Sequence, residues 1–239
     1  LVHGAGGDAS VWAPQERRFR EKTLVLRVEL PGHGGSGGRG ETGISEYAGW
    51  VREAVRGAVG SEGFVLGGHS MGGAVALQLA VDGAEGLEAL VLVATGARLG
   101  VAPVIFRLIR EDFEGFVRTI DRAALGPDAS RAVRDAAADP LRRCPPEVVH
   151  GDFAACDRFD LRDRLGEVRV PALVICGVED RLTPLSLSES LAKGLPGGRL
   201  RTVPGAGHRV MLERPEAVNE AMAAFLRETG LFGRPSRRG

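Results

Sequence analysis

The stretch FVLGGHSMGGAVALQLA, from Phe64 to Ala80, surrounds one serine with glycines at the point where an apolar run passes into a helical pattern. Phe64–Leu66 is short and apolar, which is typical of a strand buried on both faces, and Met71–Val81 has the pattern of a helix. The residues between them, Gly68-His69-Ser70-Met71-Gly72, match the pattern G-x-S-x-G. The stretch therefore predicts a tight strand-to-helix turn with Ser70 at its tip.

Ser70 is a candidate nucleophile because such a turn pushes the serine hydroxyl out above the sheet in a strained backbone conformation. The residues two positions away on either side crowd the turn and have to be small, and here they are Gly68 and Gly72. The free N–H groups of the following helix start would face any negative charge that develops beside the serine. The alternative is a serine that only caps the helix, since serine is a favoured N-cap residue.

Outward from this turn, short apolar runs alternate with helical patterns along the chain. Strands are predicted for the runs Thr23–Val28, Phe64–Leu66, Leu90–Ala94, Ala172–Cys176 and Leu200–Val203. Helices are predicted for Ser45–Val59, Met71–Val81, Leu185–Leu195 and Pro215–Glu228. Such alternation indicates an α/β fold, in which helices cover both faces of a mostly parallel sheet.

One region interrupts the alternation. Between about Arg98 and Gly166 no run suggests a strand, but apolar residues fall at helical spacing at Phe106, Ile109, Phe113, Phe116 and Ile120. We interpret the region as a helical cap over one end of the sheet, although ordinary core-facing helices would show the same stripe. The predicted organisation is a first core part at 1–97, a cap at 98–166 and a second core part at 167–239.

Composition excludes several classes of protein. Lys plus Arg and Asp plus Glu number 31 each, so no net field favours nucleic acid or an anionic membrane surface. No apolar run approaches the ~20 residues of a membrane helix. The three cysteines, Cys144, Cys156 and Cys176, form no C-x-x-C pair, which argues against a metal site or a disulfide framework. A reducing compartment, and hence a cytoplasmic location, is the expectation.

A second glycine motif could indicate a nicotinamide cofactor. Gly4-Ala5-Gly6 with Ala9 matches G-x-G-x-x-A, and Glu29 lies at about the offset of a ribose-binding acid. The only tyrosine, Tyr47, is followed four residues later by Val51, so the Tyr-x-x-x-Lys pair of short-chain dehydrogenases is missing. Isolated matches are common in a chain with 35 glycines among 239 residues. An NAD(P)-dependent oxidoreductase is therefore a remote alternative.

A serine hydroxyl needs a base to take its proton and a third group to orient that base. In an α/β sheet these groups should follow the serine in the order acid then histidine, at the carboxyl ends of later strands. Asp180 comes just after the predicted strand at 172–176, and His208 just after the predicted strand at 200–203. The sequence thus predicts the catalytic set Ser70, Asp180 and His208.

Other residues compete for these roles. Glu179 adjoins Asp180, and the two carboxylates differ only in the direction in which they point. His3, His33 and His69 lie within glycine-rich turns, where hydrogen bonds that hold loops are the expected role, and His150 lies in the cap without an obvious partner. Stabilising the oxyanion requires two backbone N–H groups. We expect them from Met71, which follows the nucleophile, and from Ala5 in the loop His3–Gly7.

Together these motifs resemble the α/β-hydrolase fold superfamily, in particular its small capped serine esterases and haloperoxidase-like members. The resemblance rests on LVHGAGG, ELPGHGGS (29–36), GHSMGG, PALVICGVEDRLTP (171–184) and PGAGH. It implies about eight strands, with the cap after strand six and the first two strands before Leu1, and it implies that the chain given lacks them. It also favours Asp180 over Glu179.

The resemblance implies cleavage of a small, largely apolar carboxylic ester through an acyl-serine, without cofactor or metal. Relatives with the same catalytic set cleave thioesters or C–C bonds, catalyse lyase reactions or serve as ligand receptors with little turnover, so these remain alternatives. Phe106, Phe113 and Phe116 of the cap are candidates for a substrate pocket. The expected partner is a small-molecule substrate, with neither nucleic acid nor membrane involved, and the oligomeric state is left open.

Overall fold

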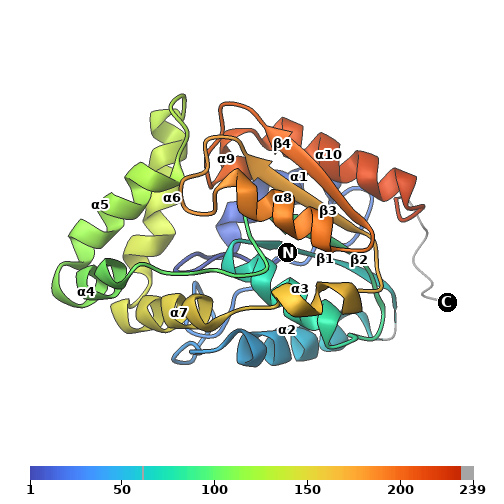
Figure 1. Cartoon of the computed structure of the whole chain (residues 1–239), viewed down its shortest axis with the longest axis horizontal. Helices are drawn as coiled ribbons and strands as arrows, with labels where there is room; N and C mark the ends of the chain where they lie inside the picture. Colours follow the sequence, from blue (N-terminus) through green and yellow to red (C-terminus); the bar gives the residue numbers. More distant parts are fainter. Residues whose placement is uncertain (61, 233–239) are drawn as a thin grey trace.

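Four parallel strands form the centre of the computed structural model, which describes residues 1–60 and 62–232 (Figure 1). They are β1 (Phe64–His69), β2 (Leu87–Val93), β3 (Ala172–Gly177) and β4 (Gly198–Val203). Their order in the sheet follows the chain, β1-β2-β3-β4, and every neighbouring pair is parallel. Val2 extends the sheet beyond β1 through parallel bridges to Gly68 and Val28.

Strands β1, β2 and β3 are largely buried on both faces, as their apolar runs predict, whereas the edge strand β4 is partly exposed. Along β2, Leu90 and Leu92 join one apolar cluster, whereas Val91 and Val93 join the other, because successive side chains of a strand point to opposite faces. Each face is covered by helices, and this confirms the predicted α/β class with a parallel sheet.

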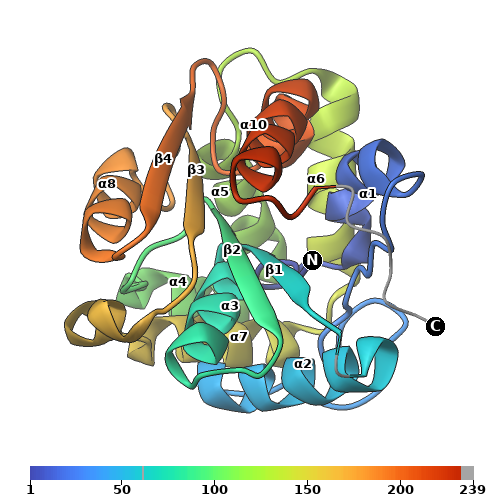
Figure 2. The same ribbon diagram turned by 90° about the vertical axis from the view of Figure 1, so that its right-hand side faces the viewer.

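The first cluster lies under α2 (Ile44–Val59), α3 (Met71–Val81) and α8 (Leu185–Gly194), and the second lies under α1 (Ala13–Phe19) and α10 (Pro215–Glu228). Figure 2 shows the two helical layers on opposite sides of the strands. The bounds of α3 and α10 are those predicted, and α2 and α8 differ from prediction by a single residue at one end. The helix α1, the 3₁₀ turn η1 (Ala9–Trp12) and the short α9 (Val210–Glu213) were not predicted.

The predicted strand Thr23–Val28 is wrong. Only Val28 pairs with the sheet, through its bridge to Val2 and a hydrogen bond from its N–H to the Leu1 carbonyl of 2.9 Å. Leu24 is 62% exposed, so the apolar character of this run does not reflect burial between two helical layers. The sheet therefore has four strands among the described residues, fewer than the resemblance implies.

Between β2 and β3 the described chain is helical. It forms α4 (Pro103–Glu111), α5 (Phe113–Ala124), α6 (Arg131–Arg143), α7 (Pro146–Arg158) and the 3₁₀ turn η2 (Arg162–Glu167). We call the segment from α4 to α7 the insertion; it gathers at one end of the sheet, in green and yellow in Figure 1. Its ends meet where the Leu161 N–H donates to the Ala97 carbonyl at 2.8 Å, and the predicted boundaries at 98 and 166 stay predictions.

The apolar stripe of the insertion does not belong to one continuous helix. Asp112 ends α4 and caps α5, because its carboxylate accepts the Gly115 N–H at 2.8 Å. Phe106 and Ile109 therefore lie on α4, while Phe113, Phe116 and Ile120 lie on α5. Aspartate is a strong N-cap residue, and this explains the break.

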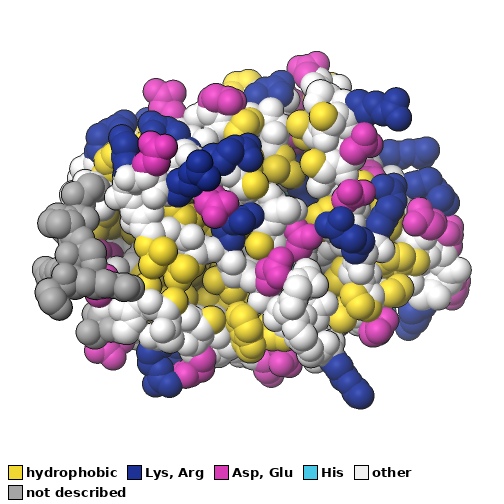
Figure 3. Space-filling model, turned by 180° about the vertical axis from the view of Figure 1, so that it is seen from behind, with side chains coloured by type: hydrophobic (Ala, Val, Ile, Leu, Met, Phe, Trp, Pro, Cys, Tyr) yellow, Lys and Arg dark blue, Asp and Glu magenta, His cyan; other side chains and the backbone are white. Residues whose placement is uncertain are grey.

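The surface carries both signs of charge. Figure 3 shows basic and acidic side chains interspersed with small apolar areas over the face opposite to that of Figure 1. Among residues 1–60 and 62–232, no helix combines the length and the apolar character needed to cross a bilayer.

Candidate active site

Ser70 occupies the junction between β1 and α3 in a strained conformation. Its φ of 52° and ψ of −117° lie outside the regions that residues with a Cβ normally adopt. The backbone is held there by its neighbours: the Ser70 N–H donates to the Val93 carbonyl at 2.9 Å, and the Thr95 hydroxyl donates to the Ser70 carbonyl at 2.9 Å. The Ser70 hydroxyl makes no capping hydrogen bond to α3, so the alternative of a capping serine is not supported.

The positions around Ser70 have to be glycine because other backbone segments pack against them too closely for a side chain. A Cβ on Gly68 would collide with the Gly72 carbonyl, and a Cβ on Gly72 would lie 2.5 Å from the Val2 carbonyl oxygen. Gly4 lies close as well, since a Cβ there would be 3.2 Å from that of Ser70. Strand β1, helix α3 and the loop after Val2 can therefore converge on the serine only because these positions lack side chains.

His208 and Asp180 are hydrogen-bonded to each other at the same end of the sheet. The distance between His208 Nδ1 and Asp180 Oδ2 is 2.9 Å, and both residues are buried. Thr183 supports the carboxylate, since its hydroxyl donates to Oδ2 at 2.7 Å and its N–H to Oδ1 at 2.9 Å. Burial alone would raise the pKa of Asp180, but His208 and the Thr183 hydrogen bonds lower it. The structure thus pairs His208 with Asp180, not with the half-buried Glu179.

His208 lies beside the serine turn through contact with His69. The two rings are 4.7 Å apart between centroids, and His69 Nε2 donates to the His208 carbonyl at 3.0 Å. Burial, the neighbouring charge of His208 and that of Arg209 hold the pKa of His69 well below its ordinary value, so His69 is neutral. Because Asp180 engages Nδ1 of His208, Nε2 is the ring nitrogen left free for the predicted role of base. A hydrogen bond between Ser70 and His208 is not formed among the described residues, and such bonds often tighten only with substrate bound.

The predicted oxyanion loop lies against the serine. The Gly7 N–H donates to the Gly4 carbonyl at 3.0 Å and closes a turn, in which Gly6 has a φ of 60°. Among the described residues, the N–H groups of Ala5 and Met71 are not engaged in hydrogen bonds. They remain the predicted donors to an oxyanion.

A buried carboxylate that the sequence analysis missed holds this loop. Asp152, on α7 of the insertion, accepts the Gly6 N–H at 2.8 Å, the Tyr47 hydroxyl at 2.6 Å and His33 Nε2 at 2.8 Å. Asp152 and His33 are fully buried. Burial alone would lower the pKa of His33, but the hydrogen bond and charge of Asp152, with a contribution from Cys144, raise it to about 10. His33 is therefore an imidazolium that forms a buried ion pair.

His33 and His3 hold loops, as predicted. His33 Nδ1 donates to the Pro31 carbonyl at 3.0 Å, while His3 Nδ1 donates to the Gly4 carbonyl at 2.9 Å and His3 Nε2 accepts the Leu30 N–H at 3.1 Å. Burial and the nearby His33 charge lower the pKa of His3 to about 4, which matches a neutral ring that donates once and accepts once. The sequence offers one clue to Asp152, a single acidic residue in the stretch VVHGDFAAC at 148–156.

The three candidate pocket phenylalanines have partners within the insertion. Phe116 is fully buried, stacks on Phe113 with ring centroids 5.7 Å apart, and meets Phe153 edge to face at 5.3 Å. Phe106 meets His150 at 5.4 Å. Phe113 and Phe116 thus belong to the apolar core of the insertion, whereas Phe106 contacts the His150 ring, and the assignment of all three to a substrate pocket stays a prediction.

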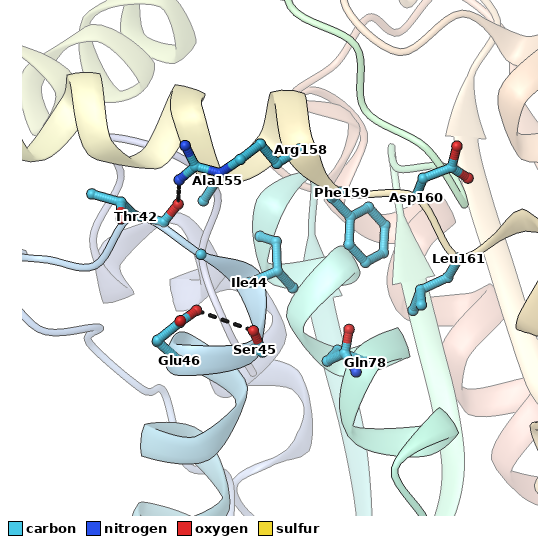
Figure 4. A pocket seen from close by; sticks show the side chains of 11 residues that line it. Thr42, Ile44, Ser45, Glu46, Gln78, Ala155, Arg158, Phe159, Asp160 and Leu161 are labelled. Atoms are coloured by element: carbon cyan, nitrogen blue, oxygen red, sulfur yellow. Dashed lines mark hydrogen bonds between the residues drawn. The ribbon is translucent and has the colours of Figure 1, made fainter.

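A cavity of about 310 Å³ lies elsewhere, where α7 meets the first turn of α2 and Gln78 of α3. Figure 4 shows the Arg158 side chain at its edge, where it donates a hydrogen bond to the Thr42 carbonyl, and the Ser45 hydroxyl, which donates one to the Glu46 carboxylate. Neither Ser70 nor His208 lines this cavity. The candidate catalytic residues therefore lie outside it.

Comparison with known proteins agrees with this geometry. Residues 1–221 match the model of a family described as the alpha/beta hydrolase family. The chain belongs to the alpha/beta hydrolase family. As a member of this family it is an enzyme of the hydrolase class, and the predicted resemblance is confirmed.

Relatives in the alpha/beta hydrolase family cover nearly the whole chain. A solved structure of a thermophilic esterase is 36% identical, with a TM-score of 0.84 over 96% of this chain and 89% of that one. A pimeloyl-[acyl-carrier protein] methyl ester esterase from Pectobacterium carotovorum is 29% identical over 94% of this chain and 92% of its own length. A dihydrolipoyllysine-residue acetyltransferase component of an acetoin cleaving system from Pseudomonas putida is 32% identical, and the chain spans 63% of its length.

Replacing Gly68 with alanine should destabilise the fold, because the new Cβ would collide with the backbone of α3. We expect a loss of about 3 kcal/mol or more in the free energy of unfolding, measured with urea. Gly49→Ala is the matched control, since a Cβ at this position of α2 meets no atom within 4 Å. It should be neutral or stabilising by about 0.5–1 kcal/mol. Equal effects of both substitutions would contradict the crowding argument.

The His33–Asp152 pair should make stability depend on alkaline pH. Because the folded state raises the pKa of His33 from 6.5 to about 10, its stabilisation is complete below pH 6.5 and is lost as the pH rises through about 10. We expect Tm to fall over this range in the wild type and to fall less steeply in His33→Gln, which starts from a lower Tm. His150→Gln, on the same helix α7 as Asp152, should keep the wild-type slope. Parallel curves for wild type and His33→Gln would refute the ion pair.

Proposed function

We propose that the protein is a serine esterase that cleaves a small, largely apolar carboxylic ester through an acyl-serine intermediate. The observation that carries the proposal is the hydrogen-bonded pair of Asp180 and His208 beside a strained Ser70, in the order along the chain that this fold uses. The catalytic roles of all the residues named below are part of the proposal.

In the acylation step, Ser70 Oγ attacks the ester carbonyl carbon while His208 Nε2 takes the hydroxyl proton. Asp180, hydrogen-bonded to Nδ1, keeps the imidazole in the required tautomer and stabilises the imidazolium that forms. The N–H groups of Ala5 and Met71 receive the negative charge of the tetrahedral intermediate. The C–O bond to the alcohol then breaks, and His208 returns its proton to the leaving oxygen.

In the deacylation step, water takes the place of the alcohol. His208 Nε2 removes a proton from the water as it attacks the acyl carbon. The second tetrahedral intermediate then breaks its bond to Ser70 Oγ, which takes the proton back from His208, and the free acid leaves. Esters are favoured over thioesters and C–C bonds because two of the relatives, at 29% and 36% identity, are named esterases. The proposed reaction uses these three side chains, the two backbone N–H groups and water.

The cysteines support a cytoplasmic location as part of the same proposal. Cys144, Cys156 and Cys176 are all free and buried. Burial raises the pKa of Cys176 to about 11, so it stays a thiol near neutral pH. Three unpaired thiols suit a reducing compartment.

Replacing Ser70 with alanine should abolish turnover without unfolding the protein. We expect kcat for p-nitrophenyl esters, acetate through butyrate, to fall by about 10⁴- to 10⁶-fold, as for other catalytic sets that act as a unit. A fluorophosphonate probe should label wild type at Ser70 and fail to label Ser70→Ala. Ser45→Ala, which changes an exposed serine on α2, is the control and should retain both activity and labelling.

Two results would contradict the proposal. A folded wild type that resists the probe would remove Ser70 as the nucleophile. Thermal stabilisation by the same esters without any turnover would instead indicate a ligand-binding protein.

A further inference from the structure

A buried arginine directly follows the histidine of the catalytic set. Arg209 is 5% exposed, which is unusual for a charged side chain. Its N–H donates to the Ala124 carbonyl, at the end of α5, at 3.2 Å, and its carbonyl accepts the Leu212 N–H at 2.8 Å. Arg209 therefore lies where the insertion meets the segment that carries His208.

The guanidinium of Arg209 has no partner within the described chain. Among residues 1–60 and 62–232 it donates no hydrogen bond and has no carboxylate within 4.0 Å, and its Nε is fully buried. Burial lowers the pKa of Arg209 from its ordinary value, as expected for a cation removed from water without a counterion. The side chain is thus a desolvated positive charge that the protein does not neutralise by contact.

Three carboxylates interact electrostatically with Arg209, but each of them is bound to other groups. Asp8 pairs with Arg143 at 3.1 Å, and Asp121 lies 3.7 Å from Arg142. Glu213 accepts the Gly126 and Gly207 N–H groups at 2.7 and 2.9 Å. All three act on Arg209 only through space. None of them is placed to form the planar, paired contact that a guanidinium makes with a carboxylate.

Arg209 lies near the residues that surround Ser70, since it directly follows His208 in the chain. Its charge acts on His69, which precedes the nucleophile and packs on His208. Asp8 follows directly after the loop that carries Ala5, and Asp121 lies on α5 of the insertion. The buried Arg209 therefore lies near the serine turn, the loop that carries Ala5 and the end of α5.

A buried, unpaired charge costs several kcal/mol, so proteins keep charges in such places mainly where a partner neutralises them. We propose that the partner is the substrate: Arg209 binds an ionised carboxylate on an ester, so the preferred substrate carries a second, free carboxylate in addition to the scissile ester. A half-ester of a dicarboxylic acid, with an apolar chain between its two ends, is such a compound. The inference rests on the proposed esterase function of Ser70.

The test compares esters that differ only in this charge. Monoethyl succinate, glutarate and adipate carry the carboxylate on the acyl side, and their half-amides are neutral matches; 3-acetoxypropionate and its amide place the charge on the alcohol side. In wild type we expect kcat/KM to be about 10- to 100-fold higher for the acid than for the amide in one of the two series, as for a charge-assisted contact. Absence of this preference in both series would overturn the proposal.

Variants then assign the preference to Arg209. Arg209→Met keeps the bulk of the side chain and should bring the acid-to-amide ratio to about one, while Arg209→Lys, which keeps the charge without the planar fork, should give an intermediate ratio. Arg214→Met is the control, because Arg214 faces Asp128 at 3.6 Å and should leave the ratio unchanged. A wild-type ratio in folded Arg209→Met, or in Arg209→Lys should the methionine variant not fold, would overturn the proposal.

Binding separates this proposal from the esterase proposal. Calorimetry on Ser70→Ala measures affinity for the half-ester and its half-amide without turnover. Tighter binding of the half-ester with no hydrolysis by wild type would leave the carboxylate site standing and remove the esterase. Hydrolysis by wild type with equal binding of both compounds would remove the carboxylate site alone.

Discussion

The positive φ of Ser70 is the constraint on which the rest of the site depends. It lets the chain turn from β1 into α3 within one residue, and this brings the Val2–Gly7 loop, the strand and the helix into backbone contact. Such a conformation costs about 1–3 kcal/mol and persists only where its surroundings enforce it. Here the conformation is held by hydrogen bonds to the Val93 carbonyl and from the Thr95 hydroxyl. The absence of side chains at Gly68 and Gly72 allows the surrounding backbone to pack closely against it.

Two charges are buried near this turn, and the protein treats them differently. The carboxylate of Asp152 is matched by the His33 imidazolium and by two further donors, so its desolvation is offset within the fold. The guanidinium of Arg209 has no such partner among the described residues. Asp152 and His33 form a structural ion pair, whereas Arg209 is the group that we propose binds an anionic substrate.

Local patterns predict the elements of this fold well but not its long-range contacts. Periodicity predicts α3 and α10, and the position of loops after strands predicts Ser70, Asp180 and His208, because parallel strands end at one edge of the sheet. The run Thr23–Val28 misleads since composition does not reveal which segments find a partner strand. Asp152 and His33 are 119 residues apart, and no spacing rule brings an acid on a helix to a histidine in a turn.

The bond between Asp152 and the Gly6 N–H bears on how a ligand can reach Ser70. Moving α7 away from the core would leave the His33 imidazolium buried without its counterion and would release the loop that carries Ala5. The insertion is therefore latched to the core at α7. A route to Ser70 that leaves α7 in place therefore also keeps the loop that carries Ala5 in position.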